Sequence, residues 1–420
     1  MKIERLIIEK FRAIRFADIA IYDLTALVGQ NSSGKSSILR ALNAFFNFEL
    51  ERDSFERNQH SFFPTAFAVI DVTFSGVPTT CTLPRVVVGG SDVRARLRYR
   101  KQAQWQIFTA GSWTAITGQD LHEQLERYIS YALVPTRRDA IAGWGADGIL
   151  EQALEQAVSS ARQRDNLTPR IQELSARLQK QALDGLAAKL RKSTPLAGSF
   201  EYVIETTSRL DYRVLMQDLS IRIREGSHTV GLPDAGSGNQ SLAVFALYSY
   251  LAELKNSTYI LGFEEPEQNL HPQAQTQLMA SLKKTGLQVV FTTHSPTLID
   301  ALDHESVVLC RRKSTAVREV EMEVAQLATG FFAAHGLNRD DYYRFHQRRN
   351  SEFFFADHVL VTESPIDSAV IAQIILDTGL DVMSGQVVES ADGWGADCGV
   401  SPMVIVEVQP AGECVSSLGL

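Results

Sequence analysis

Hydrophobic and polar positions alternate in short runs over residues 1–30, as in the stretch from Lys2 to Ile8. This alternation predicts two or three half-buried β-strands. The run from Leu24 to Val28 is almost wholly apolar, which is typical of a short buried strand. From Ile38 to Phe46 the apolar residues recur at helical spacing instead. The pattern therefore predicts strands that lead into a strand–turn–helix unit, with its turn at residues 29–37.

The next two regions differ in their periodicity. Residues 66–117 are β-like, with turn signals at Ser75-Gly76, Gly89-Gly90 and Gly111-Ser112. Residues 147–192 show helical spacing, and we expect a short antiparallel helical pair that projects from the core. Thr168 and Pro169 fit the cap and first position of its second helix.

Strand and helix patterns alternate again in the second half of the chain. An apolar helical run spans Leu242 to Leu251, and two strand-like runs follow, Tyr259 to Phe263 and a run from Gln288 that ends at His294. Alternation of this kind predicts an α/β fold. From about Gly393 onward the sequence has neither a helical nor a strand period.

Composition narrows the class of protein. The 420 residues are 45% hydrophobic and 21% charged, which indicates a globular chain of two or three domains. The formal net charge of -8 excludes a globally basic, histone-like protein but allows a local basic groove. The four cysteines form no C-x-x-C pair, so neither a zinc site nor a disulfide framework is indicated. Without a signal-peptide pattern or an apolar run long enough for a bilayer, we expect a soluble, cytoplasmic protein that has no contact with a membrane.

A row of basic residues lies within the β-like region. Arg94, Arg96, Arg98 and Arg100 recur at every second position, so a strand would place all four guanidinium groups on one face. One interpretation is a surface that follows the phosphates of a nucleic acid. The other is a solvated face of an edge-exposed sheet, where positive charge discourages edge pairing. The sequence leaves both open.

The turn at residues 29–37 fits G-x-x-x-x-G-K-[ST], the phosphate-binding P-loop. Glycine permits backbone conformations that a Cβ would block, and the N–H groups at the start of the next helix attract phosphate. Lys35 would reach the β- and γ-phosphates of a nucleotide, and the Ser36 hydroxyl would hold Mg²⁺. The candidate nucleotide-binding residues of this loop are Gly29, Asn31, Ser33, Gly34, Lys35, Ser36 and Ser37.

A second small-residue loop, residues 234–241, precedes the helical run from Leu242. A loop of this kind at a helix N-terminus can bind an anion, although a simple turn before a buried helix fits the same residues. Its candidate nucleotide-binding residues are Gly236, Ser237, Gly238 and Gln240.

Polar residues follow the two later strands. Glu264 and Glu265 come directly after an apolar run, where α/β folds place their ligands. Glu264 could hold the Mg²⁺ shell, and Glu265 could orient and deprotonate an attacking water. His294 ends the next strand, and we expect it to sense the γ-phosphate. Lys35, Glu265 and His294 are therefore the candidate catalytic residues.

The ordered set of motifs resembles a known family. The P-loop, G-S-G-x-Q-S, E-E-P-E-x-x-L-H-P and T-T-H-S-P follow one another as in the ABC-type ATPase heads of the SMC, RecF and OLD (overcoming lysogenisation defect) groups. The opening stretch Met1 to Ile14, which includes Phe11 to Ile14, is also similar to their first strands. Residues 264–272 look most like OLD proteins, because transporter and SMC heads usually carry Asp at the position of Glu264. Residues 134–139 resemble a stretch of OLD-type ATPases as well.

The resemblance implies a fold and an assembly. The fold would be an ABC/SMC-type P-loop ATPase head with an added antiparallel β layer and a helical-pair insertion. The implied domains are 1–145 and 196–330 for the two parts of the head, 146–195 for the insertion and 331–420 for a linker and a C-terminal segment. The family implies homodimers, or higher oligomers, in which the 236–241 loop of one subunit closes over ATP and Mg²⁺ on the other.

The C-terminal segment resembles part of a TOPRIM (topoisomerase–primase) nuclease domain. Glu363 and Asp367 match its first two acidic residues, which implies a second metal site, although Ser364 replaces the usual glycine. A later strand ending in D-x-D, which a complete site needs, is not found. We therefore expect a partial TOPRIM-like α/β segment and poor order from about Gly385.

The resemblance implies an ATP hydrolase that acts on DNA, within a nuclease or antiviral defence system. A second hypothesis is a non-degrading, ATP-gated scaffold that binds a separate nuclease effector, as in PARIS. A RecF- or SMC-like repair ATPase is a third, against which the short helical arm and the Glu363 segment argue. A transporter ATPase fits least, because the chain continues into the Glu363 segment.

Overall fold

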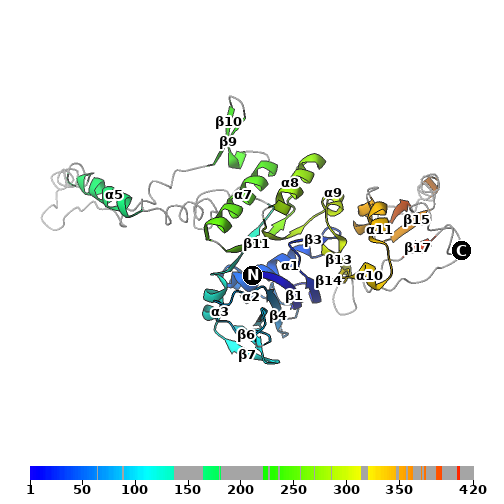
Figure 1. The fold of residues 1–420 in the computed structure, drawn as a ribbon, viewed down its shortest axis with the longest axis horizontal. Helices are drawn as coiled ribbons and strands as arrows, with labels where there is room; N and C mark the ends of the chain where they lie inside the picture. Colours follow the sequence, from blue (N-terminus) through cyan, green and yellow to red (C-terminus); the bar gives the residue numbers. More distant parts are fainter. Residues whose placement is uncertain are drawn as a thin grey trace, which may run out of the picture. The chain divides into compact units, whose positions relative to one another are not determined.

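Among the residues that the structure describes, twelve strands form one mixed sheet (Figure 1). At one end of the sheet six neighbouring strands pair antiparallel. In their order across the sheet they are β7 (Ser112–Ile116), β6 (Ala103–Thr109), β5 (Val93–Tyr99), β4 (Ala68–Ser75), β1 (Lys2–Phe11) and β2 (Ile14–Ala20).

The other half of the sheet is mostly parallel, and only β13 and β14 pair antiparallel within it. Continuing from β2, the order is β14 (Glu321–Gln326), β13 (Val307–Lys313), β3 (Leu24–Val28), β12 (Gln288–Thr292), β11 (Thr258–Glu264) and β8 (Ile129–Val134). Every residue of β3 and β12 is buried, as expected of strands covered on both faces. The predicted α/β fold with an added antiparallel layer is confirmed.

The computed structural model describes most of the chain. Its described residues are 1–63, 65–87, 89–136, 164–178, 180, 221–225, 228–234, 237–255, 257–268, 270–284, 286–313, 320–346, 350–355, 358–362, 370, 373–374, 385–389 and 404–406. The chain divides into two units, Met1–Thr136 with Ser257–Leu420, and Arg137–Asn256.

Helices α1 (Lys35–Phe46) and α2 (Phe48–Glu56) cover the inner face of the antiparallel strands. Phe45 of α1 meets Trp105 of β6 edge-on at 5.5 Å between ring centroids, and Phe55 of α2 lies 4.4 Å from Tyr99 of β5. Each aromatic ring buried in this way contributes about 1.5–3 kcal/mol. The inner face is thus the core, and the opposite face of these strands carries their polar side chains.

Short helices connect the remaining strands of the larger unit. These are α3 (Gly118–Leu125), α8 (Pro272–Lys284), α9 (Pro296–Asp300), η4 (His304–Ser306), α10 (Phe331–Ala334), α11 (Arg339–His346) and η5 (Asn350–Phe355). Thr117 caps α3 by accepting the Asp120 N–H, and Ser295 caps α9 by accepting that of Leu298. In every described part of the chain, helices are too short or too polar to cross a lipid bilayer.

The smaller unit corrects two boundaries. It holds α5 (Arg164–Leu178), β9 (Arg222–Glu225), β10 (His228–Gly231), η3 (Leu232–Asp234) and α7 (Ser237–Lys255). Pro169 lies inside α5 instead of opening a helix, because Arg164 already starts it. Helix α7 likewise begins at Ser237, inside the loop that we predicted for residues 234–241. The first helix of the expected pair lies outside the described residues.

The C-terminal segment contains a three-stranded sheet of β15 (His358–Thr362), β16 (Gly385–Glu389) and β17 (Val404–Val406). β16 pairs parallel and β17 antiparallel with β15. Gly385–Glu389 and Val404–Val406 lie in the part of the chain for which we expected poor order, and each pairs with β15 as a strand. The remaining residues after Gly385 lie outside the described parts of the chain.

Candidate functional site

The phosphate loop has backbone conformations that only glycine adopts without strain. Gly29 has φ 138° and Gly34 has φ 98°. A Cβ on Gly29 would lie 2.0 Å from the Cys310 carbonyl oxygen, and one on Gly34 would lie 2.7 Å from the Met322 sulfur. The two glycines are therefore required by β13 and β14, which pack directly beneath the loop.

Lys35 opens α1 and is buried against the same loop. Its Nζ donates to the carbonyl oxygens of Gly29 and Gln30, both at 2.9 Å. Burial lowers the pKa of Lys35, because a charged ammonium is poorly solvated there. Three neighbouring groups oppose this shift, those of Cys310, Glu265 and Glu267. The ammonium group thus lies within the electrostatic reach of the residues that follow β11.

The serines of the loop divide into buried and exposed positions. Ser33 and Ser37 are buried, whereas Ser36 and Asn31 are exposed. The Ser33 hydroxyl has no hydrogen-bond partner among the described residues. A buried hydroxyl without a partner, next to the glycines of the loop, is suited to donate to a bound phosphate, which accepts hydrogen bonds from hydroxyl and N–H groups. The exposed Ser36 at the helix N-terminus fits a Mg²⁺ ligand that faces a nucleotide.

Three strands end side by side at this loop. Strand β12 lies between β3 and β11, and Thr292 is level with Leu27 on one side and Glu264 on the other. Neighbouring strands lie about 4.8 Å apart, so the end of β11 lies about 10 Å across the sheet from the end of β3. Glu264 and Gly29, which are 235 positions apart in the chain, thereby share one edge of the sheet.

Glu265 has an unusual backbone. Its φ is 44°, and its N–H donates to both the carbonyl and the hydroxyl oxygen of Thr292, each at 3.1 Å. A left-handed conformation is uncommon for a glutamate and often marks a functional turn. The turn directs the chain away from the sheet immediately after Glu264.

Glu267 is a site residue that the sequence analysis missed. It is buried, and its Oε1 accepts from the Thr293 hydroxyl at 2.7 Å and from the His294 N–H at 2.8 Å. Burial raises the pKa of Glu267, while these hydrogen bonds oppose the shift. Glu267 thus ties the turn after β11 to the two residues that follow β12. Its place as the last residue of E-E-P-E could have pointed to Glu267 as a site residue, but the motif alone does not indicate the contact with Thr293 and His294.

His294 lies at the end of β12, in the neighbourhood of the other candidate residues. Burial and the positive charge of Lys35 lower the pKa of His294, and Glu265 opposes this shift. The imidazole is therefore mainly neutral near pH 7. Its ring also stacks on Phe355, the last residue of η5, at 6.0 Å between centroids. The histidine thus contacts the segment that leads into β15.

Arg12 is the second residue that we missed. It follows β1 with φ 53°, and its N–H donates to the His60 carbonyl oxygen at 3.1 Å. Burial and Arg40 lower the pKa of Arg12, while Glu51 and Glu264 raise it. The guanidinium is therefore close enough to Glu264 to interact with it. The sequence analysis used Phe11 to Ile14 only for a resemblance.

Several predicted site residues cannot be assessed against this geometry. Gly236, Glu363 and Asp367 lie outside the described residues. Ser237 and Gly238 belong to the first turn of α7, where only the backbone is described, and Gln240 in the same turn is buried. Among the described residues, no group of three or more His, Cys, Asp or Glu side chains could hold a metal ion.

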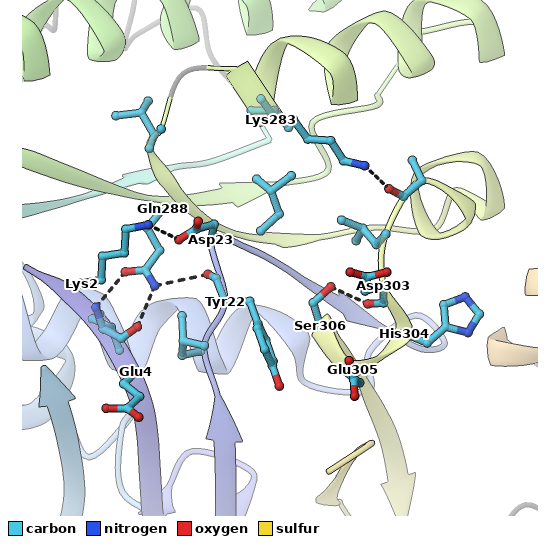
Figure 2. A pocket seen from close by; sticks show the side chains of 18 of the residues that line it. Lys2, Glu4, Tyr22, Asp23, Lys283, Gln288, Asp303, His304, Glu305 and Ser306 are labelled. Carbon is cyan, nitrogen blue, oxygen red and sulfur yellow. Dashed lines mark hydrogen bonds and ion pairs between the residues drawn. The ribbon is translucent and has the colours of Figure 1, made fainter. Parts of the chain in front are cut away.

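A cavity of about 780 Å³ lies at the opposite ends of the strands (Figure 2). Figure 2 shows Lys2 beside Asp23, and Gln288 between strand β1 and Tyr22. Lys283 donates to the Ala301 carbonyl oxygen at 2.6 Å. None of the predicted site residues lines this cavity, and these polar groups are engaged with one another. The phosphate loop therefore remains the candidate site.

Comparisons with known proteins agree with this geometry. The family described as "AAA domain, putative AbiEii toxin, Type IV TA system" matches residues 24–300, which is more than half of the chain. An SMC head bound to the C-terminal winged-helix domain of ScpA has a similar fold. Its TM-score is 0.52 at 16% identity, over 79% of this chain and 99% of that one. The ABC/SMC-type head fold is thus confirmed.

Two curated proteins are similar in sequence. The OLD nuclease of Thermus scotoductus is 25% identical over 425 residues, which cover 89% of this chain and 73% of that protein. Endonuclease GajA of Bacillus cereus is 25% identical over 179 residues, 42% of this chain and 29% of that protein. Both similarities agree with the motifs that indicated an OLD-type protein.

Proposed function

This chain belongs to the AAA domain family and is an OLD-type P-loop ATP hydrolase, and we propose that it acts on DNA as a homodimer. The observation that carries the hydrolysis is the shared sheet edge at which Lys35, Glu265 and His294 influence one another electrostatically, and the similarity to an OLD nuclease and an SMC head supports the action on DNA and the dimer. Catalysis of phosphoryl transfer depends mainly on positioning and charge stabilisation, and an edge of this kind supplies both. We also propose the four domain segments given above.

The first role that we propose is the binding of the nucleotide. The N–H groups of the phosphate loop would hold the phosphates, and Lys35 would contact the β- and γ-phosphates. Ser36 and Glu264 would hold Mg²⁺, which neutralises the charge that develops on the phosphate oxygens. Arg12, near Glu264, would add positive charge at the same edge.

The second role is the hydrolysis itself. Glu265 would orient the attacking water and accept its proton as the new oxygen–phosphorus bond forms, while the bond between the γ-phosphorus and the β,γ-bridging oxygen breaks and ADP leaves. His294, mainly neutral near pH 7, would hydrogen-bond the γ-phosphate. Glu267 would act as a positioning residue, because it holds the backbone of His294 in place.

A dimer would supply a second loop to cover the nucleotide, which one head binds from one side. We propose that Gly236, Ser237, Gly238 and Gln240 of one subunit close over ATP on the other. Gln240 lies in the first turn of α7, a helix N-terminus that attracts anions. Two such cradles around one nucleotide would exclude water other than the attacking molecule.

The test is the Glu265→Gln variant, with Glu56→Gln as a control on the exposed part of α2. Loss of a general base lowers turnover about 10²- to 10⁴-fold, whereas ATP binding should persist and the dimer should accumulate. Steady-state hydrolysis, nucleotide binding and light scattering measure these three effects. Parental turnover in Glu265→Gln would refute the role of Glu265 as the base.

Nuclease action remains a proposal that depends on Glu363 and Asp367. Plasmid cleavage with Mg²⁺ or Mn²⁺, with and without ATP, separates the two hypotheses for the C-terminal segment. Cleavage that is lost in Glu363→Ala would identify a working nuclease. Absence of cleavage by an active ATP hydrolase would favour a scaffold that needs a separate effector, as in a defence system of two components.

A further inference from the structure

The outward face of β5 carries arginine side chains that stack on aromatic rings. The guanidinium of Arg96 lies 3.8 Å from the centre of the Trp113 ring, and that of Arg98 lies 4.3 Å from the centre of Phe67. Arg100 also lies over Phe67, at 5.8 Å. Stacking of this kind restricts the side chains and leaves the guanidinium edges available as hydrogen-bond donors.

Alternation along the strand separates this surface from the core. Val93, Ala95, Leu97 and Tyr99 are buried in the core, while the arginines between them are partly exposed. Across the strands, Arg96 is level with Asp71 of β4 and with Gln106 of β6, and its Nε donates to the Gln106 side chain at 2.9 Å. We call this surface the arginine face, and it comprises Phe67, Arg94, Arg96, Arg98, Arg100, Gln106, Phe108 and Trp113.

The positive charge of the arginine face is only partly neutralised. Arg94 forms a bidentate pair with the buried carboxylate of Asp71, at 2.9 and 2.8 Å. Among the described residues, no carboxylate lies within ion-pair distance of Arg96, Arg98 or Arg100. Asp71 and Glu9 act electrostatically on Arg96 without forming an ion pair with it. A chain with a formal net charge of -8 thus presents a local row of guanidinium groups in which Arg98 and Arg100 have the least carboxylate charge nearby.

The position of β5 argues against edge protection, which is one part of the second interpretation of the arginine row; the solvated face itself stays open. β5 pairs with β4 on one side and with β6 on the other, so it is an inner strand, and β7 is the edge of the described sheet. Charges that protect an edge are useful on the edge strand itself. Like charges on one inner strand repel one another, and a polyanion would remove that cost.

The geometry selects the kind of polyanion. Alternate residues of a strand lie about 6.6 Å apart, close to the advance of two phosphates along one DNA strand at about 3.4 Å each. The rings of Trp113 and Phe67 are already covered by guanidinium groups, so they offer little free surface to an unstacked base. We propose that the arginine face binds the phosphate backbone of duplex DNA, an inference that rests on the proposed action on DNA.

The test measures binding of a fluorescent 30-base-pair duplex by the full chain over a range of NaCl concentrations. The variant is Arg98→Gln/Arg100→Gln, and the control is Arg52→Gln/Arg57→Gln, which removes the same charge from α2 and the residue that follows it. Loss of two phosphate contacts should lower the slope of log K against log salt by about 2 and weaken binding about tenfold or more at low salt. The control should keep the parental slope.

Two further arms separate the possible outcomes. Arg98→Lys/Arg100→Lys should restore most of the slope, because lysine also neutralises phosphate. A single strand of the same length should bind more weakly than the duplex, and tighter binding would overturn the choice of duplex.

Duplex binding at the parental level in Arg98→Gln/Arg100→Gln would overturn only the proposal that the arginine face binds DNA. Absence of duplex binding by the parent chain would instead overturn the proposed action on DNA. ATP hydrolysis, which should be unchanged in these variants, shows that they are folded.

Discussion

The two halves of the large sheet place their chemistry differently. In the parallel half, β3 and β12 are buried throughout, so functional groups are confined to the strand ends, where Lys35, Glu265 and His294 lie. In the antiparallel half, β5 buries one face and presents the other, so its polar side chains lie along the strand. A sheet covered on both faces thus concentrates chemistry at an edge, whereas a half-covered sheet offers a surface.

The largest effect expected from this comparison concerns Lys35. In Lys35→Ala, ATP hydrolysis should fall at least about 100-fold, because one preorganised charge at the phosphates is lost. Lys283→Ala is the matched control, since Lys283 lies at the opposite ends of the strands and bonds only a backbone carbonyl there. Steady-state hydrolysis measures both. Equal losses in the two variants would mean that the strand ends are not functionally distinct.

A smaller effect, on stability, tests how tightly the parallel half is packed. A Cβ on Gly262 would lie 1.9 Å from the Tyr131 hydroxyl, which is itself held by a 2.9 Å bond to the Leu39 carbonyl oxygen. Gly262→Ala should therefore lower the free energy of unfolding by about 3 kcal/mol. Ala115→Ser, on the exposed face of β7, should change it by less than about 0.5 kcal/mol.

Urea denaturation compares the two variants. A smaller loss in Gly262→Ala than in Ala115→Ser would contradict the contrast between a packed parallel half and an open antiparallel face.

The smallest effect concerns a buried carboxylate between α1 and α2. Glu51 lies 2.7 Å from His60 Nε2 and 2.9 Å from Arg40, and it accepts from Asn43 at 2.6 Å. Burial would raise the pKa of Glu51, but these bonds lower it to about 2. A depressed folded-state pKa contributes stability that is present above the unfolded pKa near 4.5 and is lost toward pH 2.

Between pH 5 and pH 3 this carboxylate should account for about 2 kcal/mol of lost unfolding free energy. Glu51→Gln should remove that part of the pH dependence, whereas Glu49→Gln, an exposed neighbour, should retain it. Denaturant unfolding at several pH values measures the difference. An unchanged slope in Glu51→Gln would show that its bonds do not persist in solution.

Much of the fold was predictable because local periodicity sets the type of each element. The alternation of residues 93–99 predicted β5, and the apolar run of residues 24–28 predicted β3. Boundaries were less predictable where local signals conflict with the structure. Thr168 and Pro169 have the character of a helix start, yet α5 continues through them. The small residues before Leu242 indicated a loop, yet α7 includes Ser237.

The candidate site shows the same division. The P-loop motif identified Lys35 and the carboxylates of E-E-P-E because their chemistry depends on short spacings in the chain. Arg12 and Glu267 were missed because their contacts join distant segments. Arg12 is 252 positions from Glu264, with which it interacts, and Glu267 is 27 positions from the His294 N–H.

The sequence by itself determined the phosphate loop, the order of the motifs and the family, because each motif consists of residues that are near one another in the chain and the order is that of the sequence itself. The tertiary structure alone decided that β12 lies between β3 and β11, and that β5 is an inner strand. Strand order depends on pairing between segments that are hundreds of residues apart, and periodicity carries no information about the partner. That order brings Glu265 to the phosphate loop and argues against edge protection as the role of the arginine row.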